Sequence, residues 1–249
     1  MKNPMLKKNA FLFLIFLSLA AAAYAVGPQD LVYMTEEYAP YNYTENGEAK
    51  GISVEVLKLV WKEMNCAPQE VKFYPWARSY NMVQTNKNHV LFAMSRTAAR
   101  EEMFKWVGPL YVSKFYLYGL ASKNIKLDTI TDANKYKVGA IREDVAEQLL
   151  KAKGVTIANN AAEMDINMKM LEAGRLDLVA YSEDGFQKYL LDKKMDPAQF
   201  KSCFSIGEQG SYYAFQKDTP DALIKSFQDA FDKVKTAGKL TEIIKKHTK

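Results

Sequence analysis

The sequence contains few residues of the types that most often carry catalysis. It has only two cysteines, Cys66 and Cys203, and only two histidines, His89 and His247. Neither cysteine stands in a redox or nucleophile motif, and the four residues do not show the spacing of a metal site. The sequence also has no glycine-rich loop of the kind that cradles a phosphate. We therefore expect no cofactor, no metal and no catalytic centre. Export would permit a disulfide, but a single pair of cysteines this far apart in sequence does not indicate one, and we favour two free thiols.

The sequence also lacks a dense basic stripe. The whole chain has a net charge of +5, but three lysines lie in the first 25 residues, which contain no acid. The remainder therefore carries a net charge of +2. A nucleic-acid-binding protein has basic residues clustered along one face. We expect no nucleic acid among the partners.

A long hydrophobic run occurs only near the start of the chain. The run from Ala10 to Ala23 follows the three lysines, and Ala23-Tyr24-Ala25 fits the small-x-small rule for signal-peptide cleavage. The run is shorter than the roughly 20 apolar residues that are needed to cross a bilayer. These features predict a cleaved signal peptide over residues 1–25 and a mature periplasmic protein that begins near Val26.

Strand-like and helix-like segments alternate in two successive units. The first unit has predicted strands at 31–34, 71–74 and 90–94, with helices through 53–64 and 80–83. The second has predicted strands at 137–141, 155–158 and 176–180, with helices at 144–150 and 164–171 and from 184. This order predicts an α/β protein in which each unit is a mostly parallel sheet flanked by helices.

Two further segments indicate that the chain crosses between these units twice. Residues 115–121 are rich in aromatics and suit a crossing strand, and residues 200–206 suit the return. A strand at 212–215 and helices at 221–234 and 240–246 are predicted after the return. Two connections between two lobes are the geometry of a hinge with a cleft. We expect lobe 1 at 26–116 and 206–249, and lobe 2 at 117–205.

Polar residues gather after the predicted strands, which is where open α/β sheets bind ligands. A helix starting at Thr97, directly after the third strand, would place Arg96 and Arg100 on one face. An anion between them, such as a ligand carboxylate, would relieve the repulsion of like charges at that spacing. The alternative is that both are surface arginines neutralised by Glu101 or Glu102.

Acids and aromatics follow other predicted strands. Asp144 is most simply the N-cap of the next helix, with its backbone neighbours facing the cleft. Glu183 and Asp184 are placed to receive a ligand ammonium, unless they serve as first-turn residues of a helix. Tyr38 and Trp76 follow strand ends and are the aromatics that we expect to line a pocket.

Five segments of the chain look like motifs of one family: Glu36–Tyr41, Gly51–Val56, Ser95–Arg100, Val138–Ile141 and Gly174–Val179. Through them, and through a similar tail at 212–245, the chain resembles bacterial solute-binding protein family 3, the polar-amino-acid type of periplasmic binding protein. The resemblance implies the two-lobed type II periplasmic-binding-protein fold with two hinge crossings. It also implies that Ser95 and Arg100 hold the carboxylate of the ligand and that a tyrosine of the first segment flanks its side chain.

The chain departs from that family at the site of the ligand amino group. Ser182 falls where the family has an aspartate for this group, and Glu183 is near but out of register. The second-lobe loop usually reads Gly-Thr-Thr or Gly-Ser-Thr, whereas this chain has Glu143-Asp144-Val145, so one hydroxyl contact is lost. The amino group of the ligand is therefore either absent or bound elsewhere.

The resemblance implies a monomeric periplasmic receptor. Such a protein binds a small polar, carboxylate-bearing solute without catalysis and passes it to an ABC permease in the inner membrane. One alternative is an exported enzyme on the same scaffold, similar to dehydratases, with Glu183 or Asp184 as general acid or base. Another is a soluble periplasmic sensor subunit that reports to a membrane partner.

We predict that the exported protein begins at Val26, because signal peptidase cleaves after the small-x-small motif. Intact-mass measurement of periplasmic protein should show the loss of residues 1–25. A mass that retains Met1 to Ala25, found in the membrane fraction, would instead show an uncleaved anchor.

Overall fold

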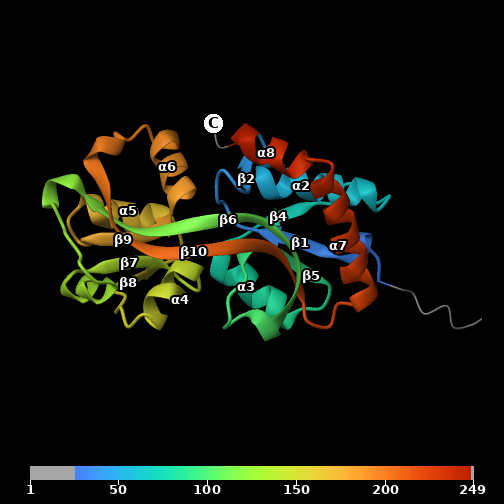
Figure 1. Ribbon diagram of the computed structural model, residues 1–249, viewed down its shortest axis with the longest axis horizontal. Coiled ribbons are helices and arrows are strands. Elements are labelled where there is room, and N and C mark those ends of the chain that lie inside the picture. The colour runs from blue at the N-terminus through green and yellow to red at the C-terminus, as the bar shows by residue number, and fades with distance from the viewer. Residues whose placement is uncertain (1–25, 248–249) are drawn as a thin grey trace, which may run out of the picture.

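The centre of the protein is one eight-stranded sheet (Figure 1). The computed structural model describes residues 26–247. In sheet order the strands are β4 (Val71–Phe73), β1 (Val32–Thr35), β5 (His89–Ser95), β10 (Phe200–Gln216), β6 (Phe104–Leu120), β9 (Leu178–Ser182), β7 (Val138–Ile141) and β8 (Asn159–Ala161). The outer three strands at each end are parallel, and the strands between them pair antiparallel. A separate hairpin pairs β2 (Tyr43–Glu45) with β3 (Glu48–Lys50).

Helices cover both faces of this sheet and form two lobes (Figure 1). Lobe 1 contains α2 (Ile52–Glu63), α3 (Trp76–Thr85), α7 (Asp221–Thr236) and α8 (Lys239–His247). Lobe 2 contains α4 (Val145–Ala152), α5 (Met164–Glu172) and α6 (Glu183–Asp192). Short 3-10 turns lie at Pro28–Asp30, Glu101–Met103, Ala121–Lys123, Ile130–Lys135 and Pro197–Gln199. The predicted α/β organisation of two mostly parallel units is confirmed.

The two lobes share the long strands β6 and β10, which run across the whole molecule in Figure 1. These strands pair from Phe104 opposite Gln216 to Leu120 opposite Phe200. The register shifts at three places between Ser202 and Tyr213, and such irregularities bend a strand locally. The predicted return crossing and the predicted strand after it are therefore one continuous strand.

Two local predictions from the sequence are wrong. Residues 155–158 form a loop rather than a strand, because their backbone N–H groups bond to other partners, such as the Leu150 carbonyl for Val155. Val155 is nevertheless buried, so its apolar side chain indicates a place in the core and not a hydrogen-bonded strand. No helix starts at Thr97, because the Arg96 N–H donates to the Gly210 carbonyl and a turn then leads into the 3-10 turn.

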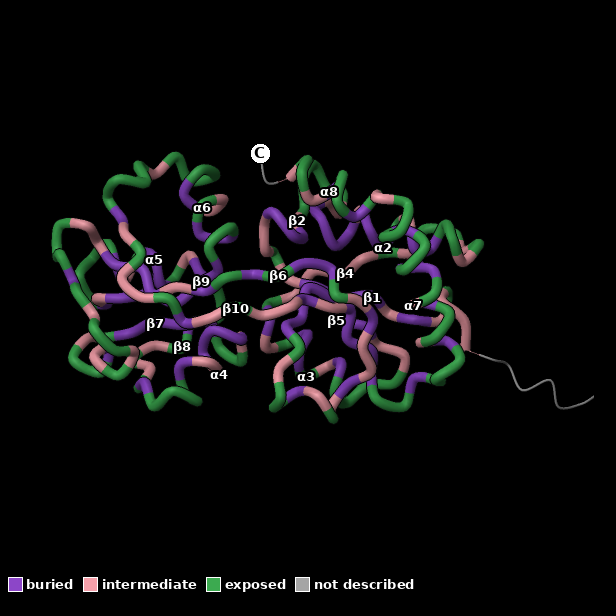
Figure 2. Tube along the Cα trace, viewed as in Figure 1, coloured by how far each residue is buried: buried purple, intermediate pink, exposed green. Residues whose placement is uncertain are grey.

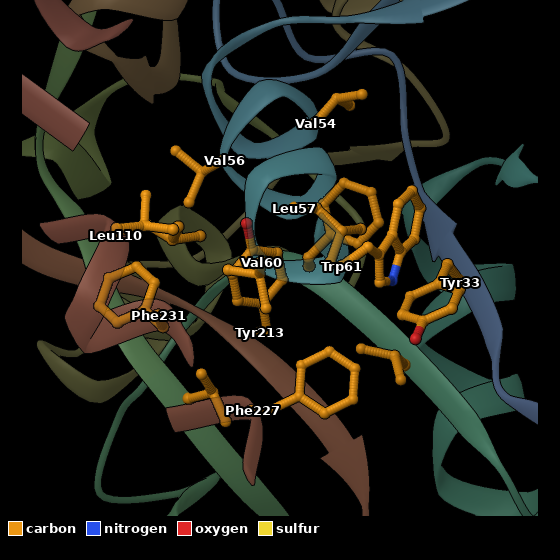
Figure 3. Close-up of a cluster of buried hydrophobic side chains, with 14 of the residues drawn as sticks. Tyr33, Val54, Val56, Leu57, Val60, Trp61, Leu110, Tyr213, Phe227 and Phe231 are labelled. Atoms are coloured by element: carbon orange, nitrogen blue, oxygen red, sulfur yellow. The ribbon is translucent and has the colours of Figure 1, made fainter. Parts of the chain in front are cut away.

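Three clusters of buried apolar side chains hold the helices on the sheet. Figure 2 shows buried residues along strands of the sheet such as β1 and β7, with exposed residues on the outer loops. The cluster under α2 and α7 includes Trp61, Phe227 and Phe231 (Figure 3). Phe227 is fully buried, and its ring lies 5.0 Å from that of Phe215 on β10. The two helices thus anchor lobe 1 to the long return strand.

Several expectations concern the chain ends and the thiols. The expected signal peptide, residues 1–25, lies outside the described residues. Within residues 26–247, none of the helices has the length and apolar character needed to cross a membrane. Cys66 and Cys203 are both free thiols.

We predict that Phe227→Ala lowers the free energy of unfolding by about 3–5 kcal/mol, because it removes a buried ring and leaves a cavity. Chemical denaturation monitored by circular dichroism measures the change. Leu191→Ala is the control, since Leu191 is 71% exposed and its loss should change stability by no more than about 0.5 kcal/mol. Equal effects of the two substitutions would contradict this account of the core.

Candidate functional site

A small enclosed cavity lies between the two lobes. Its lining includes five residues that the sequence singled out: Tyr38, Trp76, Ser95, Arg100 and Asp144. All of these except Asp144 belong to lobe 1, where they follow β1 and β5 or begin α3. Asp144 belongs to lobe 2 and follows β7. The carboxyl ends of parallel strands from both lobes therefore meet here, as expected for a ligand site in α/β sheets. The cavity volume is about 10 Å³, room for roughly one water.

Arg100 is the buried cation of this cavity, with 1% of its surface exposed. Its Nη2 donates to the Glu143 carbonyl at 2.7 Å and its Nη1 donates to the Ser95 carbonyl at 3.2 Å. Its guanidinium lies over the rings of Trp76 and Tyr80, at 5.5 and 5.0 Å from their centroids. Among residues 26–247, Arg100 Nε finds no hydrogen-bond partner.

A single carbonyl of lobe 2 receives two donors from lobe 1. The Glu143 carbonyl accepts from Arg100 and also from Trp76 Nε1 at 2.8 Å. Glu143 has a φ of 61°, a left-handed conformation that few residues other than glycine adopt. The next residue, Asp144, caps α4 by accepting from the Ala146 N–H at 2.9 Å, which confirms the predicted N-cap. The turn before α4 is thus held against Arg100.

Two carboxyl groups share the cavity with Arg100. Glu36, which sequence reasoning did not select, follows β1, and Asp144 stands on the opposite lobe. Burial raises the pKa of Glu36, and the nearby Asp144 raises it further while Arg100 opposes the shift. Burial also raises the pKa of Asp144, against its backbone hydrogen bonds and Arg100. Both carboxyl groups are therefore poorly solvated as anions.

The lobes also touch on the side of the cavity nearest α6. Tyr41 OH donates to Asp184 Oδ2 at 2.7 Å, and Ser113 Oγ donates to Tyr41 OH at 3.2 Å. The rings of Tyr38 and Tyr181 lie 5.5 Å apart across the same junction. Gly185 permits this approach, because a Cβ there would stand 2.9 Å from the Tyr38 ring. The described conformation is therefore a closed one.

Arg96 does not line this cavity, and the expectation that it shares a face with Arg100 is wrong. Its Nε donates to Glu101 Oε2 at 2.7 Å, and its guanidinium lies near the rings of Trp106 and Tyr212. The chain turns between the two arginines instead of forming a helix, so they point apart. The alternative that both arginines lie at the surface is confirmed for Arg96, which pairs with Glu101, and is wrong for Arg100, which is buried.

Ser182 and Glu183 are likewise absent from the lining of the cavity. The Ser182 hydroxyl accepts from the Gly185 N–H at 3.2 Å and caps α6. Glu183 is an exposed first-turn residue that borders a shallow hollow beside Tyr118 and Phe186. Because α6 begins directly after β9, both side chains are directed by the helix start rather than by the cavity.

A larger groove between the lobes adjoins the cavity and has a volume of about 530 Å³. Glu36 lines both spaces. Tyr74 of lobe 1 and Tyr181 and Glu163 of lobe 2 also line the groove, which no motif of the sequence indicated. Its volume lies within the roughly 300–1,000 Å³ of small-molecule sites. Within residues 26–247, no cluster of three or more His, Cys, Asp or Glu side chains is placed to hold a metal ion.

Comparisons with known proteins agree with this geometry. Residues 31–249 match the bacterial extracellular solute-binding proteins, family 3. A probable histidine-binding protein of Campylobacter jejuni is 23% identical over 220 residues, 84% of this chain and 81% of that protein. A solved ancestral arginine-binding protein bound to arginine is 21% identical, with a TM-score of 0.72 over 88% of this chain and 98% of that one. A substrate-binding protein of an ABC uptake transporter from Streptococcus pneumoniae with bound histidine is 16% identical, with a TM-score of 0.77 over 87% and 91%. These structures establish the two-lobed type II periplasmic-binding-protein fold.

We predict that Glu36→Gln stabilises the unliganded protein at pH 7. The folded state raises the pKa of Glu36, so it disfavours the ionised carboxylate at any pH above that raised value. The gain should shrink as the pH falls through the raised pKa and disappear below the unfolded value of about 4.3. Thermal unfolding of both proteins between about pH 4 and pH 8 measures the difference.

Glu37→Gln is the matched control, because Glu37 is exposed and bonds to Thr44 outside the cavity. It should show no such gain at any pH. Identical unfolding of Glu36→Gln and wild type across the range would show that Glu36 is well solvated as an anion.

Proposed function

The chain belongs to the bacterial extracellular solute-binding proteins, family 3, and we propose that it is an exported receptor for a small polar solute that bears a carboxylate. The solute passes from this receptor to an ABC permease in the inner membrane. Residues 1–25 direct export to the periplasm, and the lobes comprise 26–116 with 206–249, and 117–205. The observation that carries the proposal is Arg100, a buried guanidinium with an unpaired Nε in a cavity between two lobes.

The guanidinium of Arg100 has two N–H donors that can bind one carboxylate together. The N–H of Nε and one N–H of Nη2 point the same way, and carboxylates commonly accept from two such donors at once. In the closed conformation the Glu143 carbonyl accepts a hydrogen bond from Nη2, and Nε has no partner. A ligand carboxylate that entered would satisfy Nε and compete with this carbonyl for Nη2. Ser95, which is buried beside Arg100, supplies a further polar contact.

Binding is coupled to the relative motion of the lobes. Ligand entry to a cavity of about 10 Å³ requires the lobes to open. Bending of β6 and β10 opens them, because these strands carry the chain between the lobes and pair irregularly. A ligand that contacts Arg100 on one lobe and the turn before α4 on the other favours the closed state. The permease then distinguishes closed, loaded receptor from open receptor.

We predict that Arg100→Ala nearly abolishes ligand binding. Removing one partner of a buried charge-assisted pair costs about 2–5 kcal/mol, which is roughly 30-fold to several-thousand-fold in affinity. A thermal-shift screen of amino acids, amines and small acids identifies a ligand, and titration calorimetry measures its affinity for each variant. Arg100→Lys keeps the positive charge but loses the planar pair of N–H donors, so this variant should also bind the ligand weakly.

Arg96→Ala is the matched control, since its exposed ion pair lies outside the cavity. It should change affinity by less than about threefold. Wild-type affinity in a folded Arg100→Ala protein would remove Arg100 from the site. Recovery of a chemically altered ligand after incubation would favour the alternative of an enzyme on this scaffold.

A further inference from the structure

The larger groove between the lobes remains open although the lobes already touch. Arg100 donates to the Glu143 carbonyl, and Tyr41 donates to Asp184. With both contacts made, the small cavity around Arg100 has a volume of about 10 Å³, whereas the groove has about 530 Å³. A solute that was enclosed wholly at Arg100 would leave the groove empty. The room for most of a ligand therefore lies in the groove.

The groove and the small cavity adjoin each other on lobe 1. Glu36 lines both spaces. In Tyr38–Ala39 and in Pro75–Trp76, the aromatic residue lines the cavity and its neighbour lines the groove. A ligand whose carboxylate accepts from the unpaired Nε of Arg100 can therefore extend past Glu36 into the groove.

Aromatic rings from both lobes line the groove. They belong to Tyr43, Phe73 and Tyr74 of lobe 1 and to Tyr181 and Tyr189 of lobe 2. Aromatic side chains provide large apolar contact areas, and the faces of their rings attract cations. The walls of the groove therefore suit a chain that combines an apolar part with a positive charge.

The charge of the groove is negative. Lys193 is the one cation among the described lining residues. The acids that line the groove are Glu36, Glu37, Glu163, Asp165 and Asp192. Asp165 pairs with Lys169 and Lys193, and Asp192 pairs with Lys188. The three glutamates form no ion pair within residues 26–247. A groove lined by charge of one sign attracts ligands of the opposite sign.

We propose that the groove holds the far half of a ligand that is longer than a single amino acid, and that this half carries a positive charge. The carboxylate of the ligand binds Arg100, and the unpaired glutamates of the groove attract its cation. This inference rests on the proposed function and adds the class of ligand, an elongated carboxylate with a distant cation. A dipeptide whose first residue is basic has this form, because its carboxylate and its basic side chain belong to different residues.

The first test compares dipeptides with single amino acids by titration calorimetry on the full mature protein. The probes are arginyl dipeptides whose second residue is alanine, histidine or tyrosine. Each is compared with the free second amino acid, with arginine, and with the glutamyl dipeptide of the same second residue. At least one arginyl dipeptide should bind roughly tenfold or more tightly than all three of its comparison compounds, a difference of about 1.4 kcal/mol.

A substitution in the groove wall separates the groove from the small cavity. Ala162 is exposed and lines the groove, so Ala162→Trp would fill part of it. The affinity for the arginyl dipeptide should fall by roughly tenfold or more, while the affinity for a single amino acid stays within about threefold. Ala173→Trp is the matched control, because Ala173 is an exposed alanine of the same lobe that does not line the groove. It should bind every probe like wild type.

A second pair of variants tests the charge. Glu163→Gln should lower the preference for the arginyl over the glutamyl dipeptide by roughly two- to fivefold, the range expected for an exposed ion pair. Glu172→Gln is its control, because Glu172 is an exposed acid at the other end of α5 and does not line the groove. It should leave the preference unchanged.

The outcomes separate this inference from the proposed function. If single amino acids bind as tightly as their arginyl dipeptides, if glutamyl dipeptides bind as tightly as arginyl ones, or if Ala162→Trp binds the dipeptides like wild type, the inference is overturned and the carboxylate receptor stands. If no amino acid or dipeptide binds, or if Arg100→Ala binds them all like wild type, the proposed function falls and this inference falls with it.

Discussion

The pairing of β6 with β10 is the constraint on which the rest of the structure depends. These two strands stay hydrogen-bonded from one end of the molecule to the other, and each lobe attaches its parallel strands to one side of them. Because this ribbon continues through both lobes, the lobes move relative to each other chiefly by bending it. The shifts of register near Ser205 and Ser211 mark where its ladder is least regular. One antiparallel pair thus provides both the connection and the hinge.

The ribbon also decides which surfaces face each other. It sets the carboxyl ends of β1 and β5 opposite the start of α4, so that Arg100 meets the Glu143 carbonyl. On the other flank it sets Tyr41 opposite Asp184. Contacts on both flanks enclose the space between them. In this space the Glu143 carbonyl accepts only one of the hydrogen bonds that the Arg100 guanidinium can donate. The closed state therefore leaves polar groups, such as Arg100 Nε, that a ligand would satisfy better.

Electrostatics in this space oppose stability and favour binding. Glu36, Asp144 and Arg100 are desolvated together, and the pKa values of both acids are raised. Such an arrangement costs folding free energy in the absence of a ligand, as functional sites often do. The same desolvation strengthens every interaction with a ligand of complementary charge. The charges that remain unpaired when the lobes close therefore determine which ligands this protein favours.

Several features of the site were predictable from the sequence because they are local. Asp144 was predicted as an N-cap from its place before an apolar helix, and the alternative that Glu101 neutralises Arg96 depended only on nearby residues. Arg100 and Ser95 were identified through a motif, and both line the cavity. Arg96, Ser182 and Glu183, which were also predicted for the site, do not line the cavity, because a turn or a helix start directs each side chain elsewhere.

The sequence by itself determined the α/β class, the two units, the crossings between them and the strand ends at which polar residues gather. Apolar periodicity and helix capping involve residues that are close in sequence, so both can be recognised from the sequence alone. Only the tertiary structure decided that Glu36 and Asp144, on different lobes, share one cavity with Arg100. It also decided that Tyr41 meets Asp184. These contacts join residues that are far apart in the chain, and they depend on the continuous ribbon and on the angle at which the lobes close, neither of which any local pattern encodes.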